Sequence, residues 1–435
     1  MTRDVFQSWL EKGLGRAVLF LRENDDLPYR DLIVHACTHN MAFDRQIESR
    51  TAAYEFDLIQ ATKDPAYYRD RLLASLLAPL EEEDRDQMFG IAELLAKSGD
   101  AGAKFAMLAA FSQAGNEEID GAEAIIRMDG FAGFQFVAQH RPETDVADDA
   151  WRVGWWIEIL EERHGAAEAW TELERMAAEN PVVAAWLEIV RKDRADSLAK
   201  RNAPRSNTTR GKLRVLPYSD VKQIIAVKGR KYGVPLWWGE KTTEQDREQA
   251  ARDLLMQTDT EQIIGYLRLF RRSGFSLDPF QLMQWTSHQD ADLTRFALIT
   301  PGKTTHPKVR AFALDCLAAT RHLPYIVGMF AANYEPGDSA TVARLVEIAL
   351  EPNDYHFMEV DVKAWVEKRW DEYSVPILLN LYENGPCSFC RETCVKMLIA
   401  HEALPDWMRD EARYDADEDT RALFSEKEEI SASKE

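Results

Sequence analysis

Apolar residues recur at spacings of three and four along almost the whole chain, and this spacing limits the fold more than any other sequence feature. It places the apolar side chains on one face of an α-helix. A half-buried strand would need alternation with a period of two, which is hard to find anywhere in the sequence. The pattern therefore predicts an all-α protein.

Turn and capping residues interrupt the apolar pattern repeatedly. The interruptions are Lys63-Asp64-Pro65, Ser98-Gly99-Asp100, Glu179-Asn180-Pro181, Leu277-Asp278-Pro279, Pro336-Gly337-Asp338 and Leu404-Pro405-Asp406. Each places a capping or turn residue just ahead of a new apolar run, as helix N-termini prefer. Most of the intervals suit one helix and a tight turn, so the sequence predicts successive antiparallel helices.

Two segments of the chain match each other without gaps. Residues 306–327, HPKVRAFALDCLAATRHLPYIV, align with residues 387–408, CSFCRETCVKMLIAHEALPDWM, at an offset of 81. Arg310 falls on Arg391, and several other positions keep their apolar character. The offset is close to two units of about forty residues, the length of a helix pair in one class of α-solenoid.

The same alignment offers two interpretations of the cysteine-rich stretch CSFCRETC. Cys387, Cys390 and Cys394 are candidate metal ligands, but no fourth ligand is visible. Cys390 aligns with Val309 and Cys394 with Ala313, and both of those residues belong to an apolar helical stripe. Buried cysteine behaves as a small apolar group, so packing in the core is the favoured interpretation.

The run HPKVRAFALDCLA resembles the second helix of a HEAT repeat, with a proline near the turn followed by Val309-Arg310. Related stretches lie at 180–190, 287–299 and 414–424. In that family an aspartate often precedes the Val-Arg pair by three residues, where this chain has His306 and Cys387. An Asp–Arg ladder is therefore expected only near Asp417 and Arg421.

Three longer segments are similar to a group of bacterial HEAT-repeat proteins, and the resemblance implies no particular activity. They are residues 30–44, 125–139 and 266–285. The resemblance implies an α-solenoid of antiparallel helix pairs, a HEAT-like superhelix with an extended binding surface. It implies no chemistry by itself.

Composition narrows the classes of partner. The net charge of −21 disfavours a dedicated nucleic-acid binder, because an acidic surface repels polyanions. The sequence contains no apolar run long enough to predict a membrane span, and no secretory signal is recognisable. We therefore expect a cytoplasmic protein that does not bind a membrane. The five cysteines do not suggest a disulfide scaffold.

A basic segment interrupts this acidic chain. Residues 191–231 carry thirteen Lys or Arg against three Asp, and the middle of the segment has no helical periodicity. It is either an anion-binding strip or a solvated linker whose cations pair with the acidic body, and the linker is favoured. The candidate anion-binding or partner-binding residues are Lys200, Arg201, Arg205, Arg210, Lys212 and Arg214.

The histidine pair in HACTHN is a further candidate. His35 and His39 are one helical turn apart, which is a spacing that can grip a metal ion, and Asp44 and Glu48 follow. The hydrolytic zinc motif has Glu directly after its first His, where this chain has Ala36, so a structural role is favoured.

Tryptophan pairs occur at Trp155-Trp156 and Trp237-Trp238. Neighbours on a helix point about 100° apart, so one member of each pair is expected in the core and the other can be an exposed anchor. Trp237 and Trp238 follow the basic segment and are candidate contacts for a partner, although packing is the favoured role.

These patterns predict two helical-repeat halves, residues 1–190 and 217–425, a basic linker at 191–216 and a disordered tail at 426–435. The favoured function is a non-enzymatic adaptor or regulatory scaffold that needs no cofactor and binds a protein partner. The alternative is a nucleic-acid-associated protein that binds through residues 200–231. A metal-dependent enzyme around His35 and His39 is a minor alternative.

Overall fold

The structure is a computed structural model that describes residues 1–48, 50, 52–78, 82–114, 120–141, 150–202, 215–231 and 233–424. The described residues are mostly helical and form no β-strand. An isolated antiparallel bridge joins Arg50 and Asp417. The predicted all-α class is confirmed.

The chain divides into two compact units. Unit 1 comprises residues 1–204, 387–392 and 405–435, and unit 2 comprises residues 205–386 and 393–404. This division differs from the predicted halves, because residues 387–392 and 405–424 belong with the N-terminal helices. The sequence shows where helices begin, but not which distant helices they pack against.

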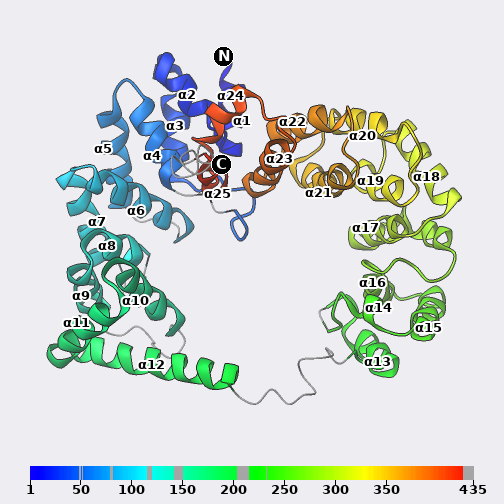
Figure 1. The fold of residues 1–435 in the computed structure, drawn as a ribbon, viewed down its shortest axis with the longest axis horizontal. Helices are drawn as coiled ribbons and strands as arrows, with labels where there is room; N and C mark the ends of the chain where they lie inside the picture. Colours follow the sequence, from blue (N-terminus) through cyan, green and yellow to red (C-terminus); the bar gives the residue numbers. More distant parts are fainter. Residues whose placement is uncertain are drawn as a thin grey trace. The chain divides into compact units, whose positions relative to one another are not determined.

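Unit 1 is built mainly from the first half of the chain (Figure 1). Its elements are α1 (Arg3–Lys12), α2 (Arg16–Glu23), η1 (Leu27–Tyr29), α3 (Arg30–Thr38), α4 (Ala52–Ala61), α5 (Pro65–Leu76), α6 (Glu82–Lys97), α7 (Ala101–Gln113), α8 (Ala122–Asp129), α9 (Phe131–His140), α10 (Ala150–His164), α11 (Ala166–Glu179), α12 (Pro181–Asn202), α24 (Asp406–Ala412) and α25 (Glu418–Ala422). Helices that follow each other in sequence pack together, for example α6 with α7 and α8 with α9. Stacked helix pairs require this local packing.

Unit 2 repeats the same local arrangement. Its elements are α13 (Tyr218–Lys228), α14 (Trp238–Lys241), α15 (Glu244–Leu255), α16 (Thr260–Leu269), η2 (Pro279–Trp285), α17 (Ala291–Ile299), η3 (Thr300–Lys303), α18 (Pro307–Ala318), α19 (Leu323–Ala332), α20 (Asp338–Val346), α21 (Pro352–Lys368) and α22 (Ser374–Asn384). Helix α23 (Ser388–Ala400) begins among residues of unit 1 and ends among residues of unit 2. Within unit 2, α18 packs on α19 and α19 packs on α21.

The predicted helix starts are confirmed where capping residues mark them. The Asp64 side chain accepts a hydrogen bond from the Tyr67 N–H at the start of α5, and Asp100 accepts one from Ala103 at the start of α7. Each bond satisfies a backbone donor that the first helical turn leaves without a partner. Asp278 likewise caps the segment after it, but that segment is the 3-10 helix η2.

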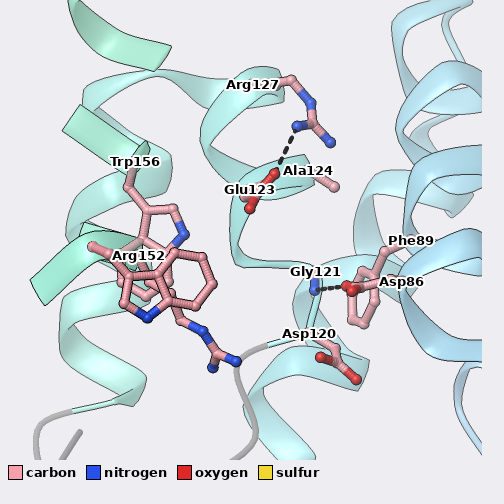
Figure 2. Close-up of a pocket in the computed structure, with 10 residues that line it drawn as sticks. Asp86, Phe89, Asp120, Gly121, Glu123, Ala124, Arg127, Arg152 and Trp156 are labelled. Atoms are coloured by element: carbon pink, nitrogen blue, oxygen red, sulfur yellow. Dashed lines mark hydrogen bonds and ion pairs between the residues drawn. The ribbon is translucent and has the colours of Figure 1, made fainter. Parts of the chain in front are cut away.

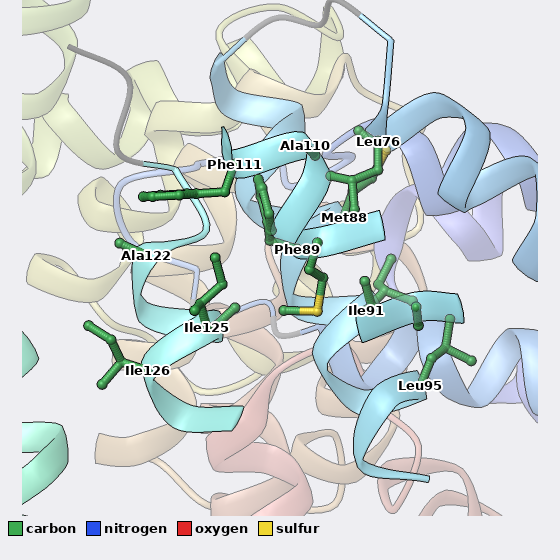
Figure 3. Packing of buried hydrophobic residues seen from close by; sticks show 14 of the residues in the cluster. Leu76, Met88, Phe89, Ile91, Leu95, Ala110, Phe111, Ala122, Ile125 and Ile126 are labelled. Carbon is green, nitrogen blue, oxygen red and sulfur yellow. The ribbon is translucent and has the colours of Figure 1, made fainter. Parts of the chain in front are cut away.

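The core of unit 1 lies between successive helices. Figure 3 shows Leu76 of α5, Phe89 of α6, Phe111 of α7 and Ile125 of α8 in one buried cluster. Unit 2 has its own core, which includes Trp238. Each unit therefore buries the apolar stripe of its helices against neighbouring helices of the same unit.

The internal repeat is visible in the structure. Arg310 makes two hydrogen bonds to the Asp338 carboxylate, at 2.6 and 2.7 Å, and the equivalent Arg391 makes two to Asp415, at 2.7 and 3.0 Å. Cys390 and Val309 are both buried at equivalent positions. The two copies thus share a bidentate ion pair that the sequence alignment did not predict.

In the described residues, Asp417 and Arg421 do not pair with each other as an Asp–Arg ladder would require. Asp417 instead caps α25 and accepts hydrogen bonds from the Thr420 N–H and hydroxyl. Arg421 pairs with Asp57 of α4 at 2.7 Å. The expectation was wrong because Arg421 reaches a helix far away in sequence, which the repeat pattern does not reveal.

These contacts attach residues 405–424 to the N-terminal helices of unit 1 (Figure 1). The Ala416 N–H donates to the Gly13 carbonyl at 2.9 Å, and Arg16 pairs with Glu411 at 2.9 Å. Gly13 has φ of 67°, and a Cβ there would lie 2.3 Å from the Ala416 Cβ. Glycine is therefore required where the two distant segments meet.

Candidate functional site

The principal candidate is a pocket of about 440 Å³ in unit 1, which we call the unit 1 pocket (Figure 2). Three helices and the turn before α8 supply its lining residues: Asp86 and Phe89 from α6, Asp120, Gly121, Glu123, Ala124 and Arg127 from the turn and α8, and Trp151, Arg152 and Trp156 from α10. The pocket is therefore made by packing and not by one local motif.

The floor of the unit 1 pocket depends on Gly121. Its N–H donates to Asp86 Oδ1 at 3.2 Å, and its φ of 84° is in the left-handed region (Figure 2). A Cβ at this position would lie 2.4 Å from the ring of Phe89. Only glycine lets the backbone turn so closely over that ring.

Carboxylates form one side of the unit 1 pocket. Asp86, Asp120 and Glu123 line it, and Asp120 is buried. Arg127 donates to Glu123 at 3.2 Å (Figure 2). It also donates to Glu93 at 3.1 Å, so part of the acidic charge is balanced from within unit 1.

Tryptophans of α10 form the other side. Trp156 is 2% exposed and packs against Trp186 with ring centroids 5.4 Å apart. Trp151 is 61% exposed, and Trp155, one helical turn further on, is 53% exposed. The prediction that Trp155 and Trp156 divide into an exposed and a buried member is confirmed.

This combination of side chains is suited to recognition. Exposed indoles at a concave site are typical anchor points in protein interfaces, and aromatic faces also attract cations. Carboxylates beside them favour a positively charged group. The unit 1 pocket therefore offers indole rings and carboxylates to a bound segment, beside Arg127 and Arg152 of its own lining.

Trp237 and Trp238 lie in unit 2. Trp238 is fully buried, and its Nε1–H donates to the Leu216 carbonyl at 2.8 Å. Trp237 is half-buried. Trp238 thus belongs to the unit 2 core, as the packing interpretation expected.

Much of the basic segment lies outside the part of the chain that the structure describes. This holds for the side chains of Lys200 and Arg201 and for the whole of Arg205, Arg210, Lys212 and Arg214. The structure does describe four other cations of residues 191–231 in ion pairs with carboxylates: Arg191–Glu174, Arg194–Glu161, Lys222–Asp253 and Arg230–Asp290. These four cations are thus paired with carboxylates, and Arg191, Arg194 and Lys222 lie in helices α12 and α13.

His35 and His39 stack on each other at the end of α3, with ring centroids 4.1 Å apart. Burial and the nearby His39 lower the pKa of His35. Glu48 does not join the two histidines. Its carboxylate instead accepts hydrogen bonds from the N–H and hydroxyl of Ser388. In the described ranges, no group of three clustered metal-ligating side chains includes either histidine.

Cys387, Cys390 and Cys394 are all buried. A hydrogen bond between the thiols of Cys387 and Cys390, together with burial, raises the pKa of Cys387 well above its usual range. The neutral thiol is therefore the stable form of Cys387 at neutral pH.

No family model matches the chain, and no curated protein or solved structure gives a match. Across the described ranges, no helix has the length and apolar character needed to cross a bilayer.

Proposed function

We propose that this chain is a non-enzymatic adaptor or regulatory scaffold, built from HEAT-like helix pairs, that binds a protein partner. The observation that carries the proposal is the tryptophan face of α10, where Trp151, which lines the unit 1 pocket, and Trp155, one helical turn further on, are both more than half exposed. Large aromatic side chains are usually buried, and exposed ones concentrate at interfaces.

The chemistry of the unit 1 pocket indicates the kind of segment that the partner contributes. Asp86, Asp120 and Glu123 line the pocket beside indole rings, and the whole chain carries a charge of −21. A basic segment of the partner, with Lys or Arg directed into the pocket, complements this surface. A cytoplasmic location fits this proposal.

The test is capture of the tagged full-length chain from its native cells, with and without nuclease. A Trp151→Ala/Trp155→Ala variant should lose a protein partner that the parent chain retains after nuclease treatment. Phe105→Ala, which alters another exposed aromatic side chain of unit 1 outside the pocket, should retain it. Equal recovery by the two variants contradicts the role of the tryptophan face.

The same capture distinguishes the alternatives. A nucleic-acid binder should recover nucleic acid and lose it when Lys200, Arg201, Arg205, Arg210, Lys212 and Arg214 are neutralised, with a steep dependence on salt. A metal-dependent enzyme should lose bound metal when His35 and His39 are both replaced by alanine. Either result would replace the adaptor proposal.

A further inference from the structure

Unit 2 contains a groove of about 620 Å³ that the proposed function does not use, and we call it the unit 2 groove. Five parts of unit 2 line it: α14, the turn after α16, the α17–η3 segment, α19 and α21. Its cationic residues are Arg271, Arg272 and Lys303, and its apolar residues include Tyr325, Phe357 and Val360. The groove thus combines positive charge with exposed apolar surface.

Two of the three cations make no hydrogen bond or ion pair through their side chains among the described residues. Arg272 lies 4.0 Å from Glu240, whereas the side chains of Arg271 and Lys303 make no hydrogen bond or ion pair there. Burial raises the pKa of Asp361, and the positive charges of Lys303 and Arg271 oppose that rise. The two cations come from different elements but line the same groove as this carboxylate.

Close backbone contacts join three of the elements that line the unit 2 groove. A Cβ on Gly302 of η3 would lie 3.0 Å from the Gly328 carbonyl carbon of α19, and a Cβ on Gly328 would lie 3.1 Å from Asp361 Oδ2. The two glycines therefore let η3, α19 and α21 meet closely. This contact places Lys303 and Asp361 beside the same stretch of groove.

The apolar wall of the groove is open. Phe357 is 38% exposed and Val360 is 51% exposed on neighbouring turns of α21. The ring of Tyr325 lies 6.3 Å from that of Phe357. An apolar side chain placed here would cover surface that water now contacts, which favours binding.

We propose that the unit 2 groove binds a segment of a partner protein that carries a carboxylate next to an aromatic or aliphatic side chain. Arg271 and Lys303 pair with the carboxylate, Phe357 and Val360 cover the apolar side chain, and Asp361 accepts a hydrogen bond from the segment. The proposal rests on the proposed function only in that the occupant is a protein.

Nucleic acid is the less favourable occupant. A polyanion would bring several phosphates to a groove that also holds Glu240 and Asp361, on a chain of net charge −21. Each added phosphate is repelled by these acidic groups and by the charge of the chain. A single carboxylate can instead be balanced by Arg271 and Lys303.

The experiment uses a phage-displayed library of random peptides, selected on the full-length chain. Enriched peptides are synthesised with a fluorophore, and their affinities for three variants are measured by anisotropy. The groove variant is Arg271→Glu/Lys303→Glu, and the matched control is Arg344→Glu, an exposed arginine of α20 outside the groove. The third variant is Trp151→Ala/Trp155→Ala.

We expect a class of peptides rich in acidic and aromatic residues that binds the groove variant at least about tenfold more weakly, and the other two variants unchanged. Phe357→Ser/Val360→Ser provides a second test that leaves the charges in place, and it should weaken the same peptides. Equal binding to the groove variant and the control, enrichment of basic peptides alone, or no enrichment overturns the proposal. Loss of basic peptides on the tryptophan variant alone concerns the unit 1 pocket, so the two proposals fail separately.

Discussion

At the residue scale, Asp26 and Asp361 show how surroundings decide the ionisation of an aspartate. Asp26 is buried but accepts hydrogen bonds from the Tyr68 hydroxyl at 2.6 Å, the Lys63 N–H at 3.1 Å and Arg30 at 3.3 Å. Burial opposes its ionisation, yet these bonds outweigh burial and lower the pKa of Asp26.

Asp361 has the opposite balance. Burial raises its pKa, although the positive charges of Lys303, Arg271 and Lys368 oppose the rise. Its carboxylate accepts no hydrogen bond from any described residue. The two residues should therefore give unfolding stability opposite dependences on pH.

Replacing Asp361 by asparagine should raise the melting temperature of unit 2 at pH 7. Because the folded-state pKa is raised above 3.8, the folded protein binds a proton at pH values where the unfolded chain does not, and stability falls as pH rises through that window. The gain should therefore vanish near pH 4. Thermal unfolding at both pH values measures it, and an equal gain at pH 4 would contradict the assignment.

Replacing Asp26 by asparagine should destabilise unit 1 at pH 7 by about 1.5–3 kcal/mol, the usual worth of hydrogen bonds to a charged group. Since the folded-state pKa lies below 3.8, this contribution is present above that pH and is lost as pH falls through the folded value. Urea unfolding across this range measures it. The exposed Asp70→Asn serves as the control and should change little.

At the element scale, the starts of helices could be predicted because capping is local. Asp64 and Asp100 lie where an aspartate can accept a hydrogen bond from the first turn, and such residues are readable in the sequence. The partners of each helix could not be predicted, because they depend on surfaces assembled from distant segments. Asp415 as the partner of Arg391 is one example.

The candidate site was predictable to a similar extent. The divergent directions of Trp155 and Trp156 follow from helix geometry and were anticipated. The carboxylates opposite them come from α6 and the start of α8, and no spacing in the sequence links these residues to α10. Only the packing of the three helices brings them together.

Two glycines within helices give a matched prediction about packing. A Cβ on Gly133 of α9 would lie 2.4 Å from the Ile125 carbonyl oxygen of α8, whereas one on Gly154 of α10 would meet nothing within 4 Å. Gly133→Ala should therefore destabilise unit 1 by about 1–3 kcal/mol through overpacking. Gly154→Ala should stabilise it by about 0.5–1 kcal/mol, because alanine favours the helix.

Chemical denaturation of both variants measures these effects, and each variant controls for the other. No loss of stability in Gly133→Ala would show that α8 and α9 do not approach as closely as described, and a loss in Gly154→Ala would show that this position of α10 has less space than described.

At the scale of the whole molecule, unit 1 is assembled from segments at both ends of the chain. Residues 405–424 contribute the Ala416–Gly13 hydrogen bond, the Glu411–Arg16 pair and the Arg421–Asp57 pair. They also supply Asp415, the buried partner of Arg391. The stability of unit 1 therefore depends on residues that follow unit 2 in the sequence.

A chain ended at Leu404 should accordingly have a less stable unit 1. Loss of the Asp415 carboxylate alone leaves the Arg391 charge without its counter-ion, which typically costs about 3–5 kcal/mol for a buried pair. Scanning calorimetry should show the unit 1 transition at a lower temperature. A chain ended at Phe424 keeps all the described contacts and should match the full-length protein, so equal transitions in the two truncated chains would contradict this account.

The origin of unit 1 from both ends of the chain also affects its biosynthesis. Domains commonly fold as they leave the ribosome, N-terminal part first, at about 5–20 residues per second. Here the residues that complete unit 1 emerge only after all of unit 2 has been translated, on the order of ten seconds or more after α12. The nascent N-terminal helices must remain incomplete during that interval, so a prematurely terminated polypeptide should be a ready substrate for chaperones and proteases.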